Sequence, residues 1–224
     1  FKILLFILGT PHKQQTEEIE KLAEKVKSQI QNVKILKVNQ ESIKQMIAGL
    51  GDNRGLLRRT FSEGLGKIGK PALPYLKEAL LKHPNVITRR SAAKTLKLVG
   101  DPSALPYLLE ALTTDQDPVV QCSAAGAIAI FGEDAVIHLL DVLKNPNSSP
   151  IQCGLASWGL VFVGAEAPEA IKEAAKSENT IIRTAAISAL EDLIITLSDQ
   201  EALNLVSKAI EDPSESVQIE AIKL

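Results

Sequence analysis

The stretch LPYLKEAL, residues 73–80, returns almost unchanged as LPYLLEAL at residues 105–112, so that Tyr107 follows Tyr75 by 32 residues. A more degenerate copy, AVIHLLDVL, occupies residues 135–143, and its His138 follows Tyr107 by 31 residues. Leucines three and four positions apart within each copy have the spacing of one helix face. A helix that recurs at a fixed period predicts a repeat protein.

A second helical block alternates with the first. It runs from Arg58 to Gly69 and again from Arg89 to Gly100, 31 residues later. Further copies begin near Val120, Ile151, Ile182 and Val217. Each block ends where a helix C-cap glycine belongs, at Gly69, Gly100, Gly132 and Gly164. We therefore predict an all-α fold, an α-solenoid of helical hairpins with a period of 31–32 residues and about five hairpins after Arg58.

Residues 1–50 fit the repeat less well, and we predict an atypical N-terminal cap followed by one solenoid domain at residues 51–224. Glu17–Ile30 and Ser42–Leu50 have amphipathic helical patterns. Phe1–Leu8 and Val33–Val38 fit either helical segments of the cap or strands of a small β-α-β element, and we favour the cap. The missing initiator methionine and the shortened last hairpin suggest truncation at both ends.

The composition excludes several classes of protein. A hydrophobic share of 45% supports a folded core, and a net charge of -2 gives no electrostatic reason to bind nucleic acid. The apolar start, Phe1–Gly9, is too short for membrane insertion. We expect a cytoplasmic protein with free thiols, since two cysteines build no disulfide scaffold, and no metal site. Phosphate-loop, dinucleotide and metalloprotease motifs are missing from the sequence.

The two blocks together resemble a known family. Arg-x-x-Ala-Ala-x-x-Leu-x-x-x-Gly, at 89–100, and Ala-Leu-Pro-x-Leu-x-x-Ala-Leu, at 72–80, are similar to HEAT-like repeats. They resemble in particular the short repeats of cyanobacterial phycobilisome bilin lyases and their homologues, including lyase-like factors of phycobilisome degradation. The resemblance covers about Gly51 to Leu224, and no lyase-specific catalytic motif accompanies it.

The resemblance implies a protein that binds phycobilin, an open-chain tetrapyrrole, and assists its attachment to or detachment from phycobiliproteins. It implies phycobiliprotein subunits as partners, a second HEAT-like lyase subunit as a further partner, and no required cofactor beyond the phycobilin ligand. Whether the chain is itself an enzyme, a phycobilin lyase that forms or cleaves a thioether, stays open. The alternative is a non-catalytic HEAT-repeat scaffold that binds a protein partner on its concave face.

The candidate ligand site is a ladder on the second helices, expected to face outward and to line the concave side. Tyr75, Tyr107 and His138 share one repeat position and are the candidate bilin-binding residues. Glu78, Glu110 and Asp141 lie three residues later on the same helix face and are weak catalytic candidates, which would hold pyrrole N–H groups. The same pattern also fits ordinary helix positions that were repeated by duplication.

Three other sets of residues have structural interpretations. Arg58, Arg89 and Arg183 share a first-helix position with Gln121, Gln152 and Gln218, and we expect the arginines to bridge to an aspartate or a carbonyl of the neighbouring repeat. The doublets Arg58-Arg59 and Arg89-Arg90 also suit bilin propionates. Cys122 and Cys153 are equivalent positions, for which buried thiols are expected. Trp158 is expected in the core or at an interface.

Overall fold

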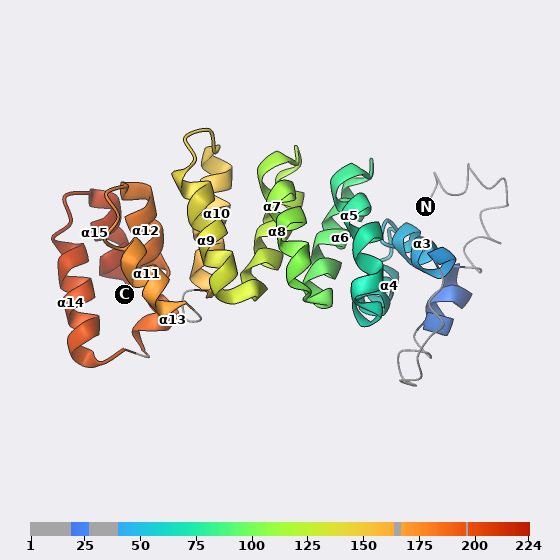
Figure 1. Ribbon diagram of the computed structural model, residues 1–224, viewed down its shortest axis with the longest axis horizontal. Helices are drawn as coiled ribbons and strands as arrows, with labels where there is room; N and C mark the ends of the chain where they lie inside the picture. Colours follow the sequence, from blue (N-terminus) through green and yellow to red (C-terminus); the bar gives the residue numbers. More distant parts are fainter. Residues whose placement is uncertain (1–18, 27–39, 164–166, 196) are drawn as a thin grey trace. The chain divides into compact units, whose positions relative to one another are not determined.

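The computed structural model describes residues 19–26, 40–163, 167–195 and 197–224, and every regular element in these ranges is a helix (Figure 1). The chain divides into two compact units, Phe1–Ala111 and Leu112–Leu224. This division separates two parts that each make most of their contacts internally, whereas the predicted boundary after residue 50 separates an atypical cap from regular repeats. The predicted cap and single solenoid domain therefore stay predictions.

The helices of the N-terminal unit pair as the repeats predict. After a helical segment at residues 19–26, the elements are α3 (Gln40–Gly49), α4 (Gly55–Ile68), η1 (Lys70–Ala72), α5 (Leu73–Lys82), α6 (Val86–Val99), η2 (Pro102–Ala104) and α7 (Leu105–Thr114), within which the unit ends. First helices α4 and α6 pack on each other, and α5 packs on α6. The predicted helix at Ser42–Leu50 is confirmed by α3.

The C-terminal unit continues the alternation. Its elements are α8 (Pro118–Ile128), η3 (Ala129–Phe131), α9 (Gly132–Lys144), α10 (Pro150–Val163), α11 (Pro168–Ala174), α12 (Thr180–Ser188), α13 (Glu191–Ile194), α14 (Asp199–Ile210) and α15 (Glu215–Lys223). Helix α10 packs on α9, α8 and α12, and α12 packs on α15. The predicted helical hairpins are confirmed.

Part of the predicted cap is described. Residues 19–26 are helical, which agrees with the helix predicted at Glu17–Ile30. Arg54, just before α4, donates to Glu20 at 2.6 Å and holds Asp52 with its side chain. Burial opposes the ionisation of Asp52, but the hydrogen bonds from Arg54 outweigh it and lower the pKa of that carboxyl. The ambiguous segments Phe1–Leu8 and Val33–Val38 lie outside the described residues.

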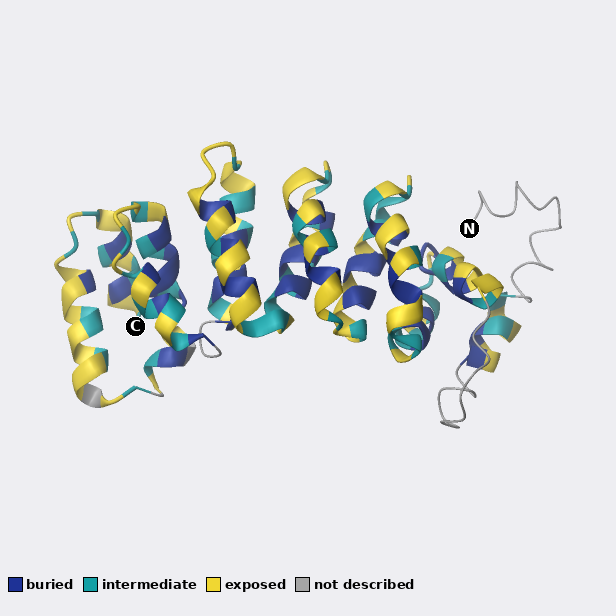
Figure 2. Ribbon diagram, viewed as in Figure 1, coloured by how far each residue is buried: buried dark blue, intermediate teal, exposed yellow. Residues whose placement is uncertain are grey.

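The core consists of the inward leucines and alanines of both helix types. Dark blue stripes run along the inner faces of the helices in each unit (Figure 2). Leu76, Leu80, Leu108 and Leu112 are fully buried, as the leucine spacing predicts. Close packing is possible because the first helices carry small residues. A Cβ at Gly159 would lie 3.1 Å from Leu139 of α9, which leaves no room for a larger residue.

The predicted helix stops at Gly69 and Gly100 are confirmed, whereas α8 ends at Ile128, before the predicted stop at Gly132, which follows η3 and begins α9. Gly164 lies outside the described residues. Gly100 ends α6 in the left-handed conformation with φ 64°, and its N–H donates to Leu96 at 3.1 Å. Gly69 ends α4 with φ 71°. Asp117 caps the start of α8, and Pro118 occupies the first helical turn, where its missing N–H costs no hydrogen bond.

One side-chain hydrogen bond recurs at the loop before the first helices. An Arg or Gln near the start of the helix donates to the backbone carbonyl six residues earlier, at 2.6 to 3.0 Å. The pairs are Arg58 with Asp52, Arg89 with His83, Gln121 with Asp115, Arg183 with Ser177, and Gln218 with Asp212. A structural bond to a carbonyl is thereby confirmed, but this carbonyl lies in the loop directly before the same helix and not in the neighbouring repeat. In α10, Gln152 instead reaches Thr113 at 2.7 Å.

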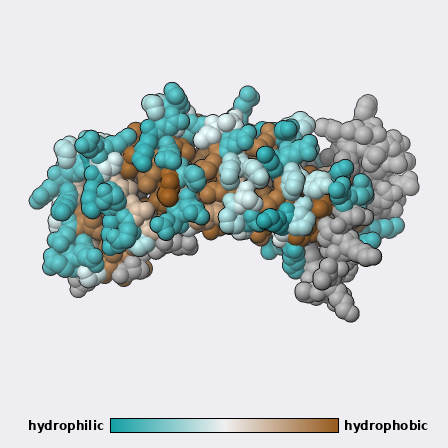
Figure 3. All heavy atoms as spheres, in the orientation of Figure 1, coloured by the Kyte–Doolittle hydropathy of each residue, from teal (hydrophilic) through white to brown (hydrophobic). Residues whose placement is uncertain are grey.

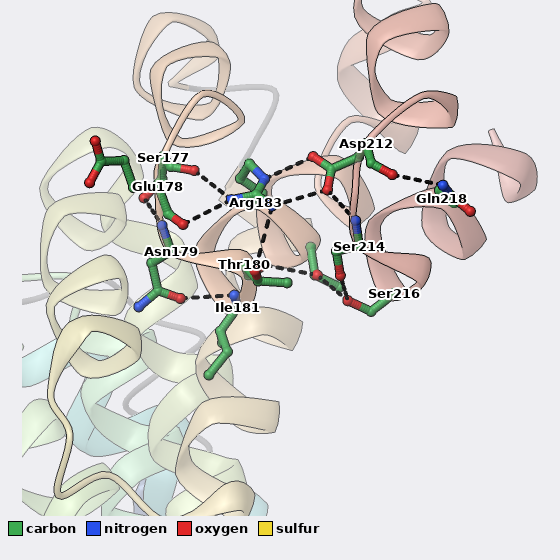
Figure 4. A network of polar contacts seen from close by, with 11 residues as sticks. Ser177, Glu178, Asn179, Thr180, Ile181, Arg183, Asp212, Ser214, Ser216 and Gln218 are labelled. Carbon is green, nitrogen blue, oxygen red and sulfur yellow. Dashed lines mark hydrogen bonds and ion pairs between the residues drawn. The ribbon is translucent and has the colours of Figure 1, made fainter.

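Arg183 does more than its equivalents, because it also joins two neighbouring repeats of the C-terminal unit (Figure 4). Its Nε and Nη2 donate to the two carboxylate oxygens of Asp212 at 2.8 and 3.0 Å. Asp212 in turn accepts from the N–H of Ser214 and, through its carbonyl, from Gln218. The Arg183 hydrogen bond is the main reason that the pKa of Asp212 is lowered, with burial opposing it.

We expect Arg183→Leu to lower the free energy of unfolding by about 2 kcal/mol, since it leaves carbonyls and a carboxylate without their donor. Arg183→Gln should cost about half as much, because glutamine makes the carbonyl bond at the equivalent position 121. Urea unfolding at pH 7 followed by circular dichroism measures both. Equal losses in the two variants would show that the loop bond contributes nothing.

The same pair has a pH dependence of known sign. Because the folded pKa of Asp212 is lowered, its contribution is complete above the ordinary aspartate pKa and is lost as the pH falls through the lowered value. The stability difference between the wild type and Arg183→Gln should therefore shrink below about pH 4. Unfolding curves at a series of pH values measure this difference in stability. A difference that stays constant down to about pH 2.5, which is below the ordinary pKa of aspartate, would contradict the pairing.

Candidate functional site

The tyrosines of the predicted ladder lie on the outer surface of the N-terminal unit. Tyr75 of α5 and Tyr107 of α7 are half-buried, whereas the leucines that follow each of them are fully buried. Glu78 and Glu110, three residues after the tyrosines, are exposed. The predicted outward orientation of these four side chains is confirmed, and their proposed roles stay predictions.

A lysine that the sequence analysis missed covers one tyrosine ring. Lys77 of α5 places its Nζ 4.5 Å from the centroid of the Tyr107 ring, in a cation–π contact between neighbouring second helices. The contact therefore places an ammonium group against the aromatic ring of the next second helix. A signal was present in the sequence: Lys77 lies one residue before Glu78, next to the ladder position.

The third member of the ladder lies in the other unit. His138 and Asp141 are both exposed on α9, and Lys144 lies 3.8 Å from Asp141. They share one helix face, as predicted from their spacing of three. The structure thus establishes two groups, Tyr75, Tyr107, Glu78 and Glu110 in the N-terminal unit and His138 with Asp141 in the C-terminal unit.

The arginine doublets divide between two roles. Arg58 and Arg89 use their guanidinium groups on loop carbonyls. Arg59 points outward and pairs with Glu63 at 2.7 Å, and Arg90 is exposed. The second arginine of each doublet is therefore the one that suits a ligand carboxylate.

The expected burial of both cysteines is wrong. Cys122 is exposed and Cys153 is half-buried, and both are free thiols. The position next to the recurring Arg or Gln lies about 100° further round the helix, and there the side chain is not buried in the core. The aligned residues Arg59 and Arg90, which are exposed, contained this signal in the sequence.

The expected core position of Trp158 is also wrong, and the interface alternative remains. Trp158 is 42% exposed on α10 and meets Phe162 edge-on, with the ring centroids 4.7 Å apart. Its indole lies over Gly126 of α8, where a Cβ would approach it to 3.3 Å. The indole ring therefore packs against α8 at Gly126, where the absence of a side chain leaves room for it. On the face drawn in Figure 3, hydrophobic side chains gather over α9 and α10, whereas α14 is hydrophilic.

Two further types of site were sought in the described parts of the chain. No group of three His, Cys, Asp or Glu residues there is arranged to hold a metal ion. None of the described helices has both the length and the apolar character that a membrane span requires.

The family model for HEAT repeats matches residues 73–154, which contain the best-preserved copies of both helical blocks. The repeats therefore have the predicted type, and the fold is an α-solenoid of HEAT-like hairpins. A sequence relative extends well beyond these repeats. The bilin biosynthesis protein MpeU of Synechococcus sp. (strain WH8020) is 45% identical over 205 residues, which are 92% of this chain and 69% of that protein. The chain belongs to the MpeU family.

Solved structures resemble this member of the MpeU family less closely than its sequence relative does. The complex of CpcE and CpcF of phycocyanin lyase from Nostoc sp. PCC7120 has a TM-score of 0.41 at 22% identity, over 83% of this chain and 98% of that chain. Human deoxyhypusine hydroxylase has a TM-score of 0.37 at 16% identity, over 92% and 94% of the two chains. Such scores do not distinguish between functions, and the family assignment rests on sequence.

The exposure of the two thiols gives a direct test of the first-helix surface. In the native protein Cys122 should react with Ellman's reagent faster than Cys153, because only Cys122 is exposed. The Cys122→Ser variant should lose the fast phase, and Cys153→Ser should keep it. Reaction of both thiols only after addition of denaturant would contradict this arrangement.

Proposed function

We propose that this protein binds phycobilin chromophores and assists their attachment to or detachment from phycobiliproteins. The observation that supports it most is the 45% identity with a protein named for bilin biosynthesis, which extends over 92% of this chain. The matched region therefore includes the helices that carry the candidate residues as well as the rest of the repeats.

The exposed groups of α5 and α7 have the chemistry that such a ligand requires. A phycobilin is a conjugated open-chain tetrapyrrole with pyrrole N–H donors and propionate groups. Tyr75 and Tyr107 offer aromatic surface, and Glu78 and Glu110 offer acceptors for the N–H groups. Lys77 offers a cation for a propionate, close to the Tyr107 ring. In this proposal His138 and Asp141 on α9 contribute the same two kinds of group.

The proposed chemistry needs no oxidant or metal. The acceptor thiol belongs to the phycobiliprotein, and it adds across a side-chain double bond of the bilin, so that sulfur bonds to carbon and the thiol proton ends on the tetrapyrrole. Detachment is the reverse elimination. A carboxylic acid among Glu78, Glu110 and Asp141 would transfer the proton. Whether the chain acts alone or with a second HEAT-like lyase subunit is part of the same proposal.

The test is a titration with phycocyanobilin, followed by visible absorption and fluorescence. We expect a red-shifted bilin band that Tyr107→Ala weakens at least tenfold in affinity, about 1.4 kcal/mol. Tyr107→Phe is the matched control, since it keeps the ring, and it should bind nearly as well. An unchanged bilin spectrum with the wild type, alone and with phycobiliprotein added, would overturn the proposal.

The catalytic part has a separate test. Glu78→Gln, Glu110→Gln and Asp141→Asn remove the acid and keep the shape. At least one variant should bind bilin normally and lose thioether formation or cleavage on added phycobiliprotein. Full activity in all three variants would show that none of these carboxyl groups transfers the proton.

A second candidate is a non-catalytic scaffold that binds a protein partner. The uncharged outer face of α10 favours it, because exposed aromatic surface is typical of protein interfaces. The two candidates differ in the bilin titration, since a scaffold leaves the pigment spectrum unchanged.

A further inference from the structure

Helix α10 differs from an ordinary surface helix because neither of its faces is polar. Its sequence from Pro150 to Val163 contains no Asp, Glu, Lys, Arg or His. The inner face is buried, at Ala156, Gly159, Leu160 and Val163. The outer face consists of Ile151, Gly154, Trp158 and Phe162, which are all exposed. A helix that is apolar all round is typical of a position that is covered on both sides.

The exposure of this face is substantial. Ile151 is 53% exposed, Trp158 42% and Phe162 54%. Helix α6, the first helix of another hairpin, has the usual polar outer face, since its exposed residues include Arg90 and Lys97. Outward charges keep α6 solvated, and α10 has none.

The helices beside α10 extend the uncharged surface. Helix α8 also lacks Asp, Glu, Lys, Arg and His, and it exposes Val119. Ile130 of η3, which follows α8, is 38% exposed, and Ile181 of α12 is 49% exposed. Large apolar patches on a soluble protein mark interaction sites. A charged partner would lose hydration here without gaining a counter-charge, so the complementary surface is itself uncharged.

The outer face of α10 matches a second copy of itself in an antiparallel arrangement. Ile151 and Phe162 lie at its two ends, and Gly154 and Trp158 lie between them. Across a two-fold axis, Trp158 of each copy lies opposite Gly154 of the other, and Ile151 lies opposite Phe162. Gly154 has space for this, because a Cβ placed there would meet no atom within 4 Å. Two-fold dimers require such a self-complementary surface.

The available area agrees with a small dimer. Helix α10 has 14 residues, which at 1.5 Å each is a length of about 21 Å. With α8 and α12 at packing distances of about 10 Å on either side, the footprint is roughly 600 Å² per copy. Two copies then bury roughly 1,200 Å², the lower limit for a specific interface.

We propose that a second copy of this chain covers the outer face of α10, forming a two-fold symmetric dimer in which the two α10 helices pack antiparallel. This inference goes beyond the proposed function, because it uses only the C-terminal unit and requires no pigment. A dimer of this size is expected to dissociate in the micromolar range.

The experiment is sedimentation velocity of the full chain from about 1 to 200 μM, a range around the micromolar constant expected for this area. The mass should rise with concentration from 24.1 kDa toward twice that value. Gly154→Glu should raise the dissociation constant at least tenfold, because its new side chain meets nothing within the monomer but blocks the partner's Trp158. Leu56→Glu on α4 is the matched control, since Leu56 is 76% exposed and belongs to the N-terminal unit; it should leave the dimer unchanged.

Trp158 supplies a second readout, because it is the single tryptophan of the sequence. Its emission should shift to the blue with protein concentration in the wild type and in Leu56→Glu, and stay constant in Gly154→Glu. If circular dichroism shows that Gly154→Glu fails to fold, Ile151→Lys replaces it at another exposed position of the same face. A wild type that stays monomeric throughout, or a dimer that Gly154→Glu and Ile151→Lys leave intact, would overturn the proposal.

Discussion

A hairpin of two helices cannot bury its own apolar face, and the arrangement of this protein depends on how each hairpin is held against the next. The loops between hairpins contain backbone carbonyls that no helix satisfies. The recurring Arg or Gln near the start of the first helix donates to one of them, as Arg89 does to His83. A partly buried carbonyl without a donor costs about 1–3 kcal/mol, which is a large share of the stability of a small repeat. The same bond therefore recurs where the other residues have diverged.

The helix turn that makes this bond also presents one side chain to solvent. Because successive residues of an α-helix are rotated by about 100°, the residue after the Arg or Gln lies on the surface, and it is Arg59 or Arg90 in the N-terminal unit and Cys122 in the C-terminal unit. The first helices thus present different chemistry at one equivalent position. Charges solvate α4 and α6, whereas α8 and α10 present thiols, glycines and aromatic rings. On the second helices the buried leucines have the same effect, and they direct the tyrosines and glutamates outward.

These two surfaces support two different proposals. The tyrosines and carboxylates of α5 and α7 combine aromatic area with polar groups, which suits a conjugated ligand with N–H donors. Lys77 over the Tyr107 ring means that such a ligand meets an ammonium group at the same place. The outer face of α10 has aromatic area without polar groups, and there the burial of apolar surface is the available driving force. A ligand of defined polarity fits the first surface, and an apolar protein surface fits the second.

The repeat alone determined the helices and the hairpins, because a period of 31–32 residues with buried leucines leaves few other folds. It also determined that Tyr75, Tyr107, Glu78 and Glu110 face outward, since their direction follows from the leucines of the same helix turn. Only the tertiary structure decided the exposure of Cys122 and Trp158 and the contact between Lys77 and Tyr107. The physical reason is that these depend on a neighbouring helix. Whether an apolar residue on a first helix is buried is set by what packs beside it, and for Trp158 that neighbour is Gly126 of α8, which supports one face of the ring and leaves 42% of the residue exposed.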